Sequence, residues 1–113
     1  MVAKKILNVN LLETIHTLLP YQAPFLFVDE FTELSDTGAN GSYRFKEDEY
    51  FYTGHFPGHP ITPGVILTET MAQIGLVGLG MFLIKAHELQ EAMTFAFTSS
   101  QVDFLKPVYP GET

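Results

Sequence analysis

Residues 63–86 read PGVILTETMAQIGLVGLGMFLIKA, and this stretch decides the fold class of the chain. Apolar residues run through it almost without a break, Pro63 suits a first helical position, and Thr62 before it is a candidate N-cap. Each glycine inside a helix costs roughly 1 kcal/mol relative to alanine, so a series of them indicates close backbone approach to a sheet or to a twin helix. The interior glycines are Gly75, Gly78 and Gly80. We therefore predict a long helix from Pro63 to about Ala86.

The same stretch raises the question of a membrane span. A span needs about 20 predominantly apolar residues, whereas Glu69 and Gln73 lie near one end of the stretch and Lys85 closes the other. On this length argument the sequence predicts no membrane span. We expect the buried central helix of a globular fold.

Shorter elements surround this helix, and they complete the expected architecture. They are a helix over residues 10–19 with Asn10 as N-cap, strands over 25–31 and 41–46, and a long strand over 93–104. The first two strands are expected to form an antiparallel pair. We predict one domain, residues 1–113, with an α+β fold in which an antiparallel sheet is wrapped around the long helix.

Composition excludes several classes of function. A content of 46% hydrophobic and 17% charged residues argues against a disordered chain. The net charge of −7 has the wrong sign for a protein that neutralises nucleic-acid phosphates or an anionic membrane surface. The chain has no cysteine, which excludes a thiolate nucleophile and Cys-ligated zinc and suits a reducing compartment, so we expect a cytoplasmic location.

Side chains with useful chemistry gather around a loop rich in proline and glycine, GHFPGHPITPG, over residues 54–64. His55 lies in this loop, and an imidazole is the side chain best suited to take and return a proton near neutral pH. Glu69 falls in the second turn of the apolar helix, where a carboxyl group needs a partner or a chemical role. The N–H groups of Gly64 and Val65 lie unpaired at the positive end of the helix, where one of them is placed to polarise a carbonyl oxygen.

Each of these residues also has a purely structural interpretation. A loop histidine such as His55 commonly bonds to backbone groups, and Glu69 would equally serve by capping the helix or bonding a neighbouring backbone group. A zinc site made by His55 and His59 would need the i, i+4 geometry of a helix, which a loop interrupted by prolines does not provide. The residues alone leave the structural and catalytic interpretations open.

Three segments together resemble the β-hydroxyacyl-acyl-carrier-protein dehydratases, which have a hot-dog fold. They are GHFPGHPITPGV with LTETMAQ (residues 54–65 and 67–73), LPYQAPFLFVD upstream (19–29) and FLKPVYPG downstream (104–111). The resemblance spans most of the chain. It implies dehydration of 3-hydroxyacyl thioesters to trans-2-enoyl thioesters in fatty-acid or related polyene or polyketide biosynthesis.

The resemblance also implies a role for each candidate residue. His55 removes the α-proton, Glu69 protonates the departing β-hydroxyl, and the N–H of Gly64, with that of Val65 beside it, holds the thioester oxygen. The substrate is carried on the phosphopantetheine of an acyl carrier protein or on coenzyme A, and no metal or redox cofactor is required. A homodimer or higher oligomer is implied, with the histidine and glutamate of one site from opposite subunits. Glutamate at position 69 matches the branch that dehydrates without isomerising.

The chain departs from the family pattern in two places. Tyr21 and Gln22 stand where the family commonly has His-Arg, which removes a basic residue from the region where a carrier or substrate would approach. The family normally continues with further strands beyond the Pro-Gly-Glu turn, so a chain ending at Thr113 is expected to leave a sheet edge uncovered. Two other functions remain open: a hot-dog subunit that binds acyl chains or completes a heterodimer without turnover, and a hot-dog thioesterase.

Overall fold

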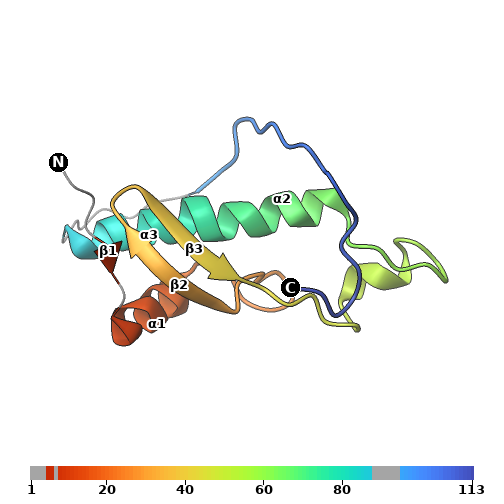
Figure 1. The fold of residues 1–113 in the computed structure, drawn as a ribbon, viewed down its shortest axis with the longest axis horizontal. Coiled ribbons are helices and arrows are strands. Elements are labelled where there is room, and N and C mark those ends of the chain that lie inside the picture. Colours follow the sequence, from red (N-terminus) through yellow and green to blue (C-terminus); the bar gives the residue numbers. More distant parts are fainter. Residues whose placement is uncertain (1–4, 7, 88–94) are drawn as a thin grey trace.

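A computed structural model describes residues 5–6, 8–87 and 95–113 of the chain (Figure 1). The N-terminal elements are β1 (Lys5–Ile6), α1 (Val9–Leu18), β2 (Glu30–Ser35) and β3 (Gly38–Ser42). A short 3-10 helix, Tyr50–Thr53, precedes a continuous helix made of α2 (Gly64–Ala72), a π-helical segment (Gln73–Val77) and α3 (Gly78–Ala86). These elements give an α+β architecture, as the sequence predicts.

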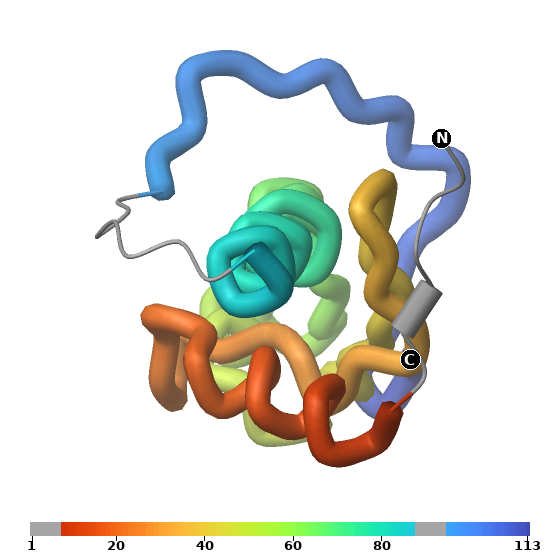
Figure 2. Tube along the Cα trace, turned by 90° about the vertical axis from the view of Figure 1, so that its left-hand side faces the viewer, coloured from red at the N-terminus to blue at the C-terminus, as the bar shows by residue number. Residues whose placement is uncertain are grey.

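The sheet packs against one side of the long helix. Its strands are antiparallel in the order β1-β2-β3, and the pairing of β2 with β3 shifts register between Phe31 and Glu33. Viewed along the helix, α1 lies beneath it, β2 and β3 lie on one side, and the segment 95–113 arches over it (Figure 2). The antiparallel pairing of the two predicted strands is therefore confirmed, although their bounds differ from the prediction.

Two apolar clusters hold the fold together. The larger cluster joins α1 and β2 to the C-terminal half of the long helix, where the side chains of Ile15, Leu34 and Phe82 are fully buried. The second cluster lies near the start of α2 and is mostly aromatic; its buried members are Phe27, Tyr43, Phe45, Tyr52 and Ile66. This second cluster anchors the loop that leads into α2, and so fixes the position of the candidate site.

The interior glycines of the helix have different surroundings, and this predicts opposite effects of alanine. A Cβ at Gly78 would lie 2.5 Å from two ring atoms of Phe31, whereas a Cβ at Gly75 would meet nothing within 4 Å. Phe31 is buried and has little room to move. We expect Gly78→Ala to lower the free energy of unfolding by about 1–2 kcal/mol, because overpacking outweighs the gain in helix propensity.

Gly75→Ala is the matched control, and we expect it to raise the free energy of unfolding by up to about 1 kcal/mol through helix propensity alone. Urea unfolding of both variants, followed by circular dichroism, measures the difference. Equal stabilisation by the two substitutions would contradict the packing of the helix on Phe31.

The structure corrects the predicted helix starts. The N-cap of α1 is Asn8, whose side chain accepts hydrogen bonds from the N–H groups of Asn10 and Leu11, so the predicted cap at Asn10 was wrong. The cap position of α2 is Pro63, and the helix begins at Gly64. Thr62 does not cap the helix, because its hydroxyl is paired with the Tyr52 hydroxyl and its N–H donates to a backbone carbonyl.

The first two strands also differ from their predicted bounds. The strand predicted over 25–31 begins only at Glu30, because backbone groups of Phe25 and Phe27 bond to the side chain of Gln73 and not to a strand. The strand predicted over 41–46 ends at Ser42. Beyond it, the backbone of Phe45 pairs with residues 111–112 of the C-terminal turn.

The long strand predicted over 93–104 is not formed in the described residues. Residues 93 and 94 lie outside the described part of the chain, and 95–104 contain no strand. A strand requires hydrogen bonds to a neighbouring backbone, and this segment crosses the helix away from the β2–β3 pair (Figure 1). The alternation of side chains in residues 95–104 was therefore not enough to predict a strand.

The length argument against a membrane span was wrong. The helix Gly64–Ala86 has 23 residues and a mean hydropathy of 1.5 in its most apolar window, which is enough by length and composition to cross a membrane. The core helix of a globular protein passes the same test, and here Val77 and Phe82 belong to the larger core cluster. Buried residues make up 39% of that window, so one side of the helix packs into the core and the rest of it is not covered by the described chain.

Candidate active site

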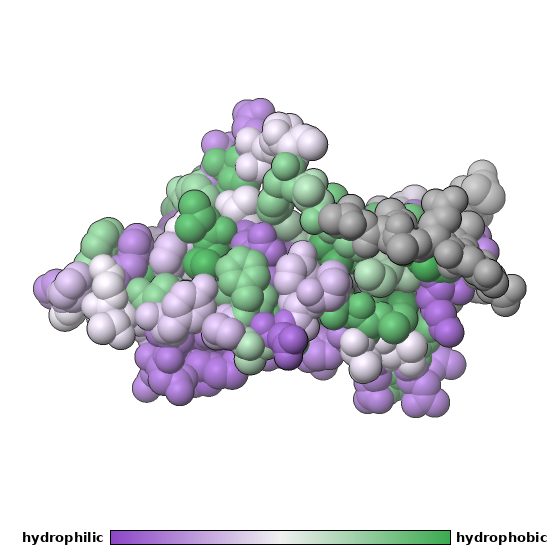
Figure 3. All heavy atoms as spheres, turned by 180° about the vertical axis from the view of Figure 1, so that it is seen from behind, coloured by the Kyte–Doolittle hydropathy of each residue, from purple (hydrophilic) through white to green (hydrophobic). Residues whose placement is uncertain are grey.

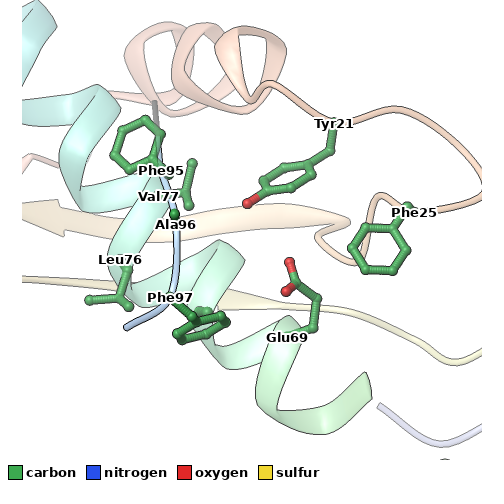
Figure 4. Close-up of a pocket in the computed structure, with 9 residues that line it drawn as sticks. Tyr21, Phe25, Glu69, Leu76, Val77, Phe95, Ala96 and Phe97 are labelled. Atoms are coloured by element: carbon green, nitrogen blue, oxygen red, sulfur yellow. The ribbon is translucent and has the colours of Figure 1, made fainter. Parts of the chain in front are cut away.

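Glu69 lies on α2 and lines a cavity of about 250 Å³ (Figure 4). The cavity lies between the long helix, the loop that follows α1, and the segment 95–97. Its lining residues are Tyr21, Phe25, Glu69, Ala72, Leu76, Val77, Phe95, Ala96 and Phe97. The walls are therefore almost entirely apolar, and Glu69 contributes a carboxylate to a cavity suited to an apolar ligand.

Gln73 holds the carboxylate of Glu69 in place. Its side chain is fully buried one helical turn after Glu69, and its Nε2 donates to Glu69 Oε2 over 2.9 Å. The same Nε2 donates to the Phe25 carbonyl at 3.0 Å, and Oε1 accepts from the Phe27 N–H at 2.7 Å. One amide thus links the candidate acid to the backbone of the loop before β2.

Sequence reasoning did not single out Gln73 as a site residue. A signal was present, because a glutamine four residues after a glutamate on a helix faces the same side. The backbone partners of the amide lie more than forty residues upstream, and only the folded structure shows them.

Replacing Gln73 by leucine is expected to lower the free energy of unfolding by about 3 kcal/mol. The substitution removes the hydrogen bonds of the amide and leaves the Phe27 N–H and the Phe25 carbonyl without that partner. Urea unfolding measures the loss, and Gln22→Leu, at an exposed position, is the control with an expected change within about 0.5 kcal/mol. A loss below about 1 kcal/mol for Gln73→Leu would contradict this role of the amide.

The start of α2 brings further predicted residues to Glu69. Gly64, Val65 and Glu69 together line a second cavity of about 610 Å³, which is also bordered by Phe97 and Phe104. Because α2 begins at Gly64, the N–H groups of Gly64 and Val65 belong to its first turn and have no acceptor within the helix. The arrangement places backbone donors at a positive helix end on the same cavity as a carboxylate.

His55 is held in a defined orientation by its loop. Its ring Nδ1 lies 2.9 Å from the carbonyl oxygen of Ile61, and its backbone N–H donates to the carbonyl of Phe51 at 3.0 Å. A carbonyl oxygen only accepts, so Nδ1 carries the proton in this contact and the neutral ring has its lone pair on Nε2. The ring stacks on Phe56 with centroids 4.0 Å apart. This tautomer leaves Nε2 ready to act as a base.

The structure does not bring every predicted residue into one cavity of one chain. His55 is not among the residues that line either cavity described above. His59, the other histidine of the loop, is exposed. In residues 5–6, 8–87 and 95–113, no three His, Asp or Glu side chains gather in a way that would hold a metal ion.

Tyr21 is a polar residue of the first cavity that sequence reasoning treated only as a departure from a family pattern. Its hydroxyl and the Glu69 carboxylate point toward one another across the cavity (Figure 4). Burial, and to a lesser degree the negative charge of Glu69, raise the pKa of the Tyr21 phenol above its usual value. The phenol therefore stays protonated and remains a donor at neutral pH.

Comparison with known proteins identifies the family. The FabA-like domain family matches residues 19–113, so the chain belongs to it and the expected hot-dog α+β fold is confirmed. Three curated relatives are named 3-hydroxyacyl-[acyl-carrier-protein] dehydratase FabZ. The protein of Geotalea uraniireducens is 36% identical over 97 residues, which are 84% of this chain and 65% of the relative.

The other two relatives have similar identities. The protein of Geobacter metallireducens is 38% identical over 96 residues, or 84% of this chain and 63% of the relative. That of Clostridium botulinum (strain Hall) is 34% identical over 110 residues, or 96% of this chain and 72% of the relative. The chain thus spans about two thirds of the length of the curated relatives it matches.

Proposed function

We propose that this chain dehydrates 3-hydroxyacyl thioesters to trans-2-enoyl thioesters, as a 3-hydroxyacyl-[acyl-carrier-protein] dehydratase of fatty-acid biosynthesis. One observation carries the proposal: Glu69 lines the second cavity together with Gly64 and Val65 of the first turn of α2, and its carboxylate also lines the first, apolar cavity. The names of the curated relatives give independent support.

The proposed mechanism assigns one task to each group. Nε2 of His55 takes the α-proton, and the electron pair of the C–H bond forms the double bond toward C3. The N–H of Gly64, with that of Val65 beside it, donates to the thioester oxygen as negative charge develops there. Glu69 gives its proton to the C3 oxygen, the C–O bond breaks, and water leaves. The elimination is redox-neutral, so we expect no redox cofactor and no metal.

We propose that a second copy of the chain completes the site. His55 is not among the lining residues of the two cavities described for Glu69 of the same chain. This arrangement supports a site in which His55 of one subunit acts together with Glu69 of the other. Apolar side chains beside the second cavity are exposed: Val65 by 76%, and Leu105, on the segment that crosses the helix, by 92%. Figure 3 shows groups of apolar residues, with polar residues between them, across the middle of one face and a mostly polar lower edge. A homodimer, alone or within a higher oligomer, would cover such surface.

The carrier of the substrate follows from the same proposal. An acyl chain in the apolar cavity would be presented on the phosphopantetheine of an acyl carrier protein, or of coenzyme A. A cytoplasmic location fits this role and fits the absence of cysteine from the sequence.

The test is to incubate the purified protein with 3-hydroxyacyl thioesters of short and long chain length. Mass spectrometry is expected to show loss of one water from the thioester, with the ultraviolet absorbance of the conjugated enoyl product and hydration in the reverse direction. Release of free thiol instead would identify a thioesterase. Binding of the thioester without either product would identify an acyl-binding subunit and would overturn the proposal.

A further inference from the structure

Among the described residues that line the first cavity, Tyr21 and Glu69 are the ones with polar side chains. Tyr21 lies in the loop between α1 and β2, half-buried, with its ring 6.5 Å from that of Phe25. Its hydroxyl and the carboxylate approach the cavity from opposite walls and point toward each other (Figure 4). Two polar groups that converge in an otherwise apolar cavity define where the polar atom of a ligand sits.

The two groups leave a place for a ligand atom between them. The hydrogen bond that the structure gives to the Glu69 carboxylate comes from Gln73 to Oε2, so Oε1 is available to a ligand. The described residues include both Tyr21 and Glu69, and no hydrogen bond joins them directly. A hydroxyl oxygen has two lone pairs, so one substrate hydroxyl between them would accept a hydrogen bond from the phenol and another from the protonated Glu69 carboxyl.

We propose that Tyr21 is a further catalytic residue, whose phenol donates a hydrogen bond to the C3 oxygen of the substrate and holds it against Glu69. This inference rests on the proposed dehydration. As Glu69 transfers its proton, the C3–O bond breaks and its electron pair stays on oxygen, which leaves as water. Tyr21 keeps its own proton throughout and stabilises the oxygen as it departs.

The chemistry of the phenol suits this role. Burial and the charge of Glu69 raise the pKa of Tyr21, so its hydroxyl is a donor across the whole neutral range. An imidazole at this position would instead titrate in that range. Such a contact also discriminates between 3-hydroxyacyl groups and acyl groups without the hydroxyl. An acyl group that lacks the C3 hydroxyl leaves the phenol and the carboxyl without that hydrogen-bond partner.

The experiment compares wild type, Tyr21→Phe and Tyr109→Phe, the last as a control at a tyrosine that is half exposed and lies in the C-terminal turn. The first readout is kcat/KM for dehydration, which we expect Tyr21→Phe to lower by about 10- to 100-fold. The second readout is binding of two unreactive amide analogues by calorimetry: 3-hydroxydecanoyl pantetheine amide and decanoyl pantetheine amide. We expect Tyr21→Phe to reduce the preference for the hydroxyl analogue by about 3- to 10-fold, and Tyr109→Phe to change neither readout.

The two readouts separate this inference from the proposed function. An active wild type with Tyr21→Phe unchanged in both readouts would overturn the role of Tyr21 and leave the dehydratase proposal standing. A wild type that binds the analogues but forms no enoyl product would overturn the proposed function, and with it the catalytic role of Tyr21. Circular dichroism of each variant shows that the fold is retained, because the Tyr21 ring keeps its apolar contacts in phenylalanine.

Discussion

Glu69→Gln is expected to lower kcat for the dehydration of 3-hydroxyacyl thioesters by about three orders of magnitude. The substitution keeps the size of the side chain and an oxygen that accepts from Gln73, so the cavity and the fold remain. It removes the proton that the leaving hydroxyl needs. The rate of enoyl formation, followed by ultraviolet absorbance, measures the loss.

The control for this prediction is Glu13→Gln, on the exposed surface of α1, which is expected to leave kcat unchanged. If Glu69→Gln retained activity within about threefold of wild type, the Glu69 carboxyl would not be the acid. Its hydrogen bond to Gln73 would then give Glu69 a structural role only.

His55→Ala is the second substitution with a large expected effect. We expect a decrease in kcat of about 10²- to 10⁴-fold, because the base that removes the α-proton is lost. The ring hydrogen bond to the Ile61 carbonyl is also lost, but the backbone hydrogen bonds of the loop are kept by the substitution. Steady-state kinetics and circular dichroism together separate a loss of catalysis from a loss of fold.

His59→Ala provides the matched control, since His59 lies in the same loop with an exposed side chain. It is expected to keep activity within about twofold of wild type. Equal losses for the two histidines would indicate that the loop as a whole, and not the imidazole of His55, is needed.

The sequence predicted the parts of the fold that depend on local pattern. The interior glycines of the long helix were expected to mark close approach to a neighbour; Gly78 does so against Phe31 of β2, whereas for Gly75 the expectation was wrong, because a Cβ there would meet nothing within 4 Å. The strand bounds were predicted less well, because they depend on contacts between distant segments. Gln73 supplies from the helix the hydrogen bonds that a strand at Phe25–Phe27 would otherwise need from a neighbour. The residue pattern of 25–31 does not indicate that a side chain from the helix takes these hydrogen bonds.

Part of the candidate site could likewise be predicted from local sequence, and part depends on contacts between distant segments. The sequence placed Glu69 and the donors Gly64 and Val65 on one helix, and a helix start has the same geometry in every fold, so their relative positions on α2 follow from their spacing. The cavity that they line also needs residues of the segment 97–104, which this spacing does not predict. The contribution of Tyr21 was not predicted, because the residue comes from a loop forty-eight residues earlier and reaches the cavity only through tertiary packing. The glutamate that we propose to act with His55 belongs to a second subunit, and contacts between subunits do not follow from the residue pattern of one chain.

A subunit-mixing experiment tests the central claim, a dehydratase site formed by His55 of one chain and Glu69 of another. His55→Ala and Glu69→Gln, each inactive alone, are unfolded together in equal amounts, refolded and assayed for enoyl formation. Random pairing into symmetric dimers would give one intact site in every mixed dimer, so we expect recovery of about one quarter of the wild-type activity. A refolded mixture that is as inactive as either variant, beside a wild-type sample that regains activity in parallel, would contradict the shared site.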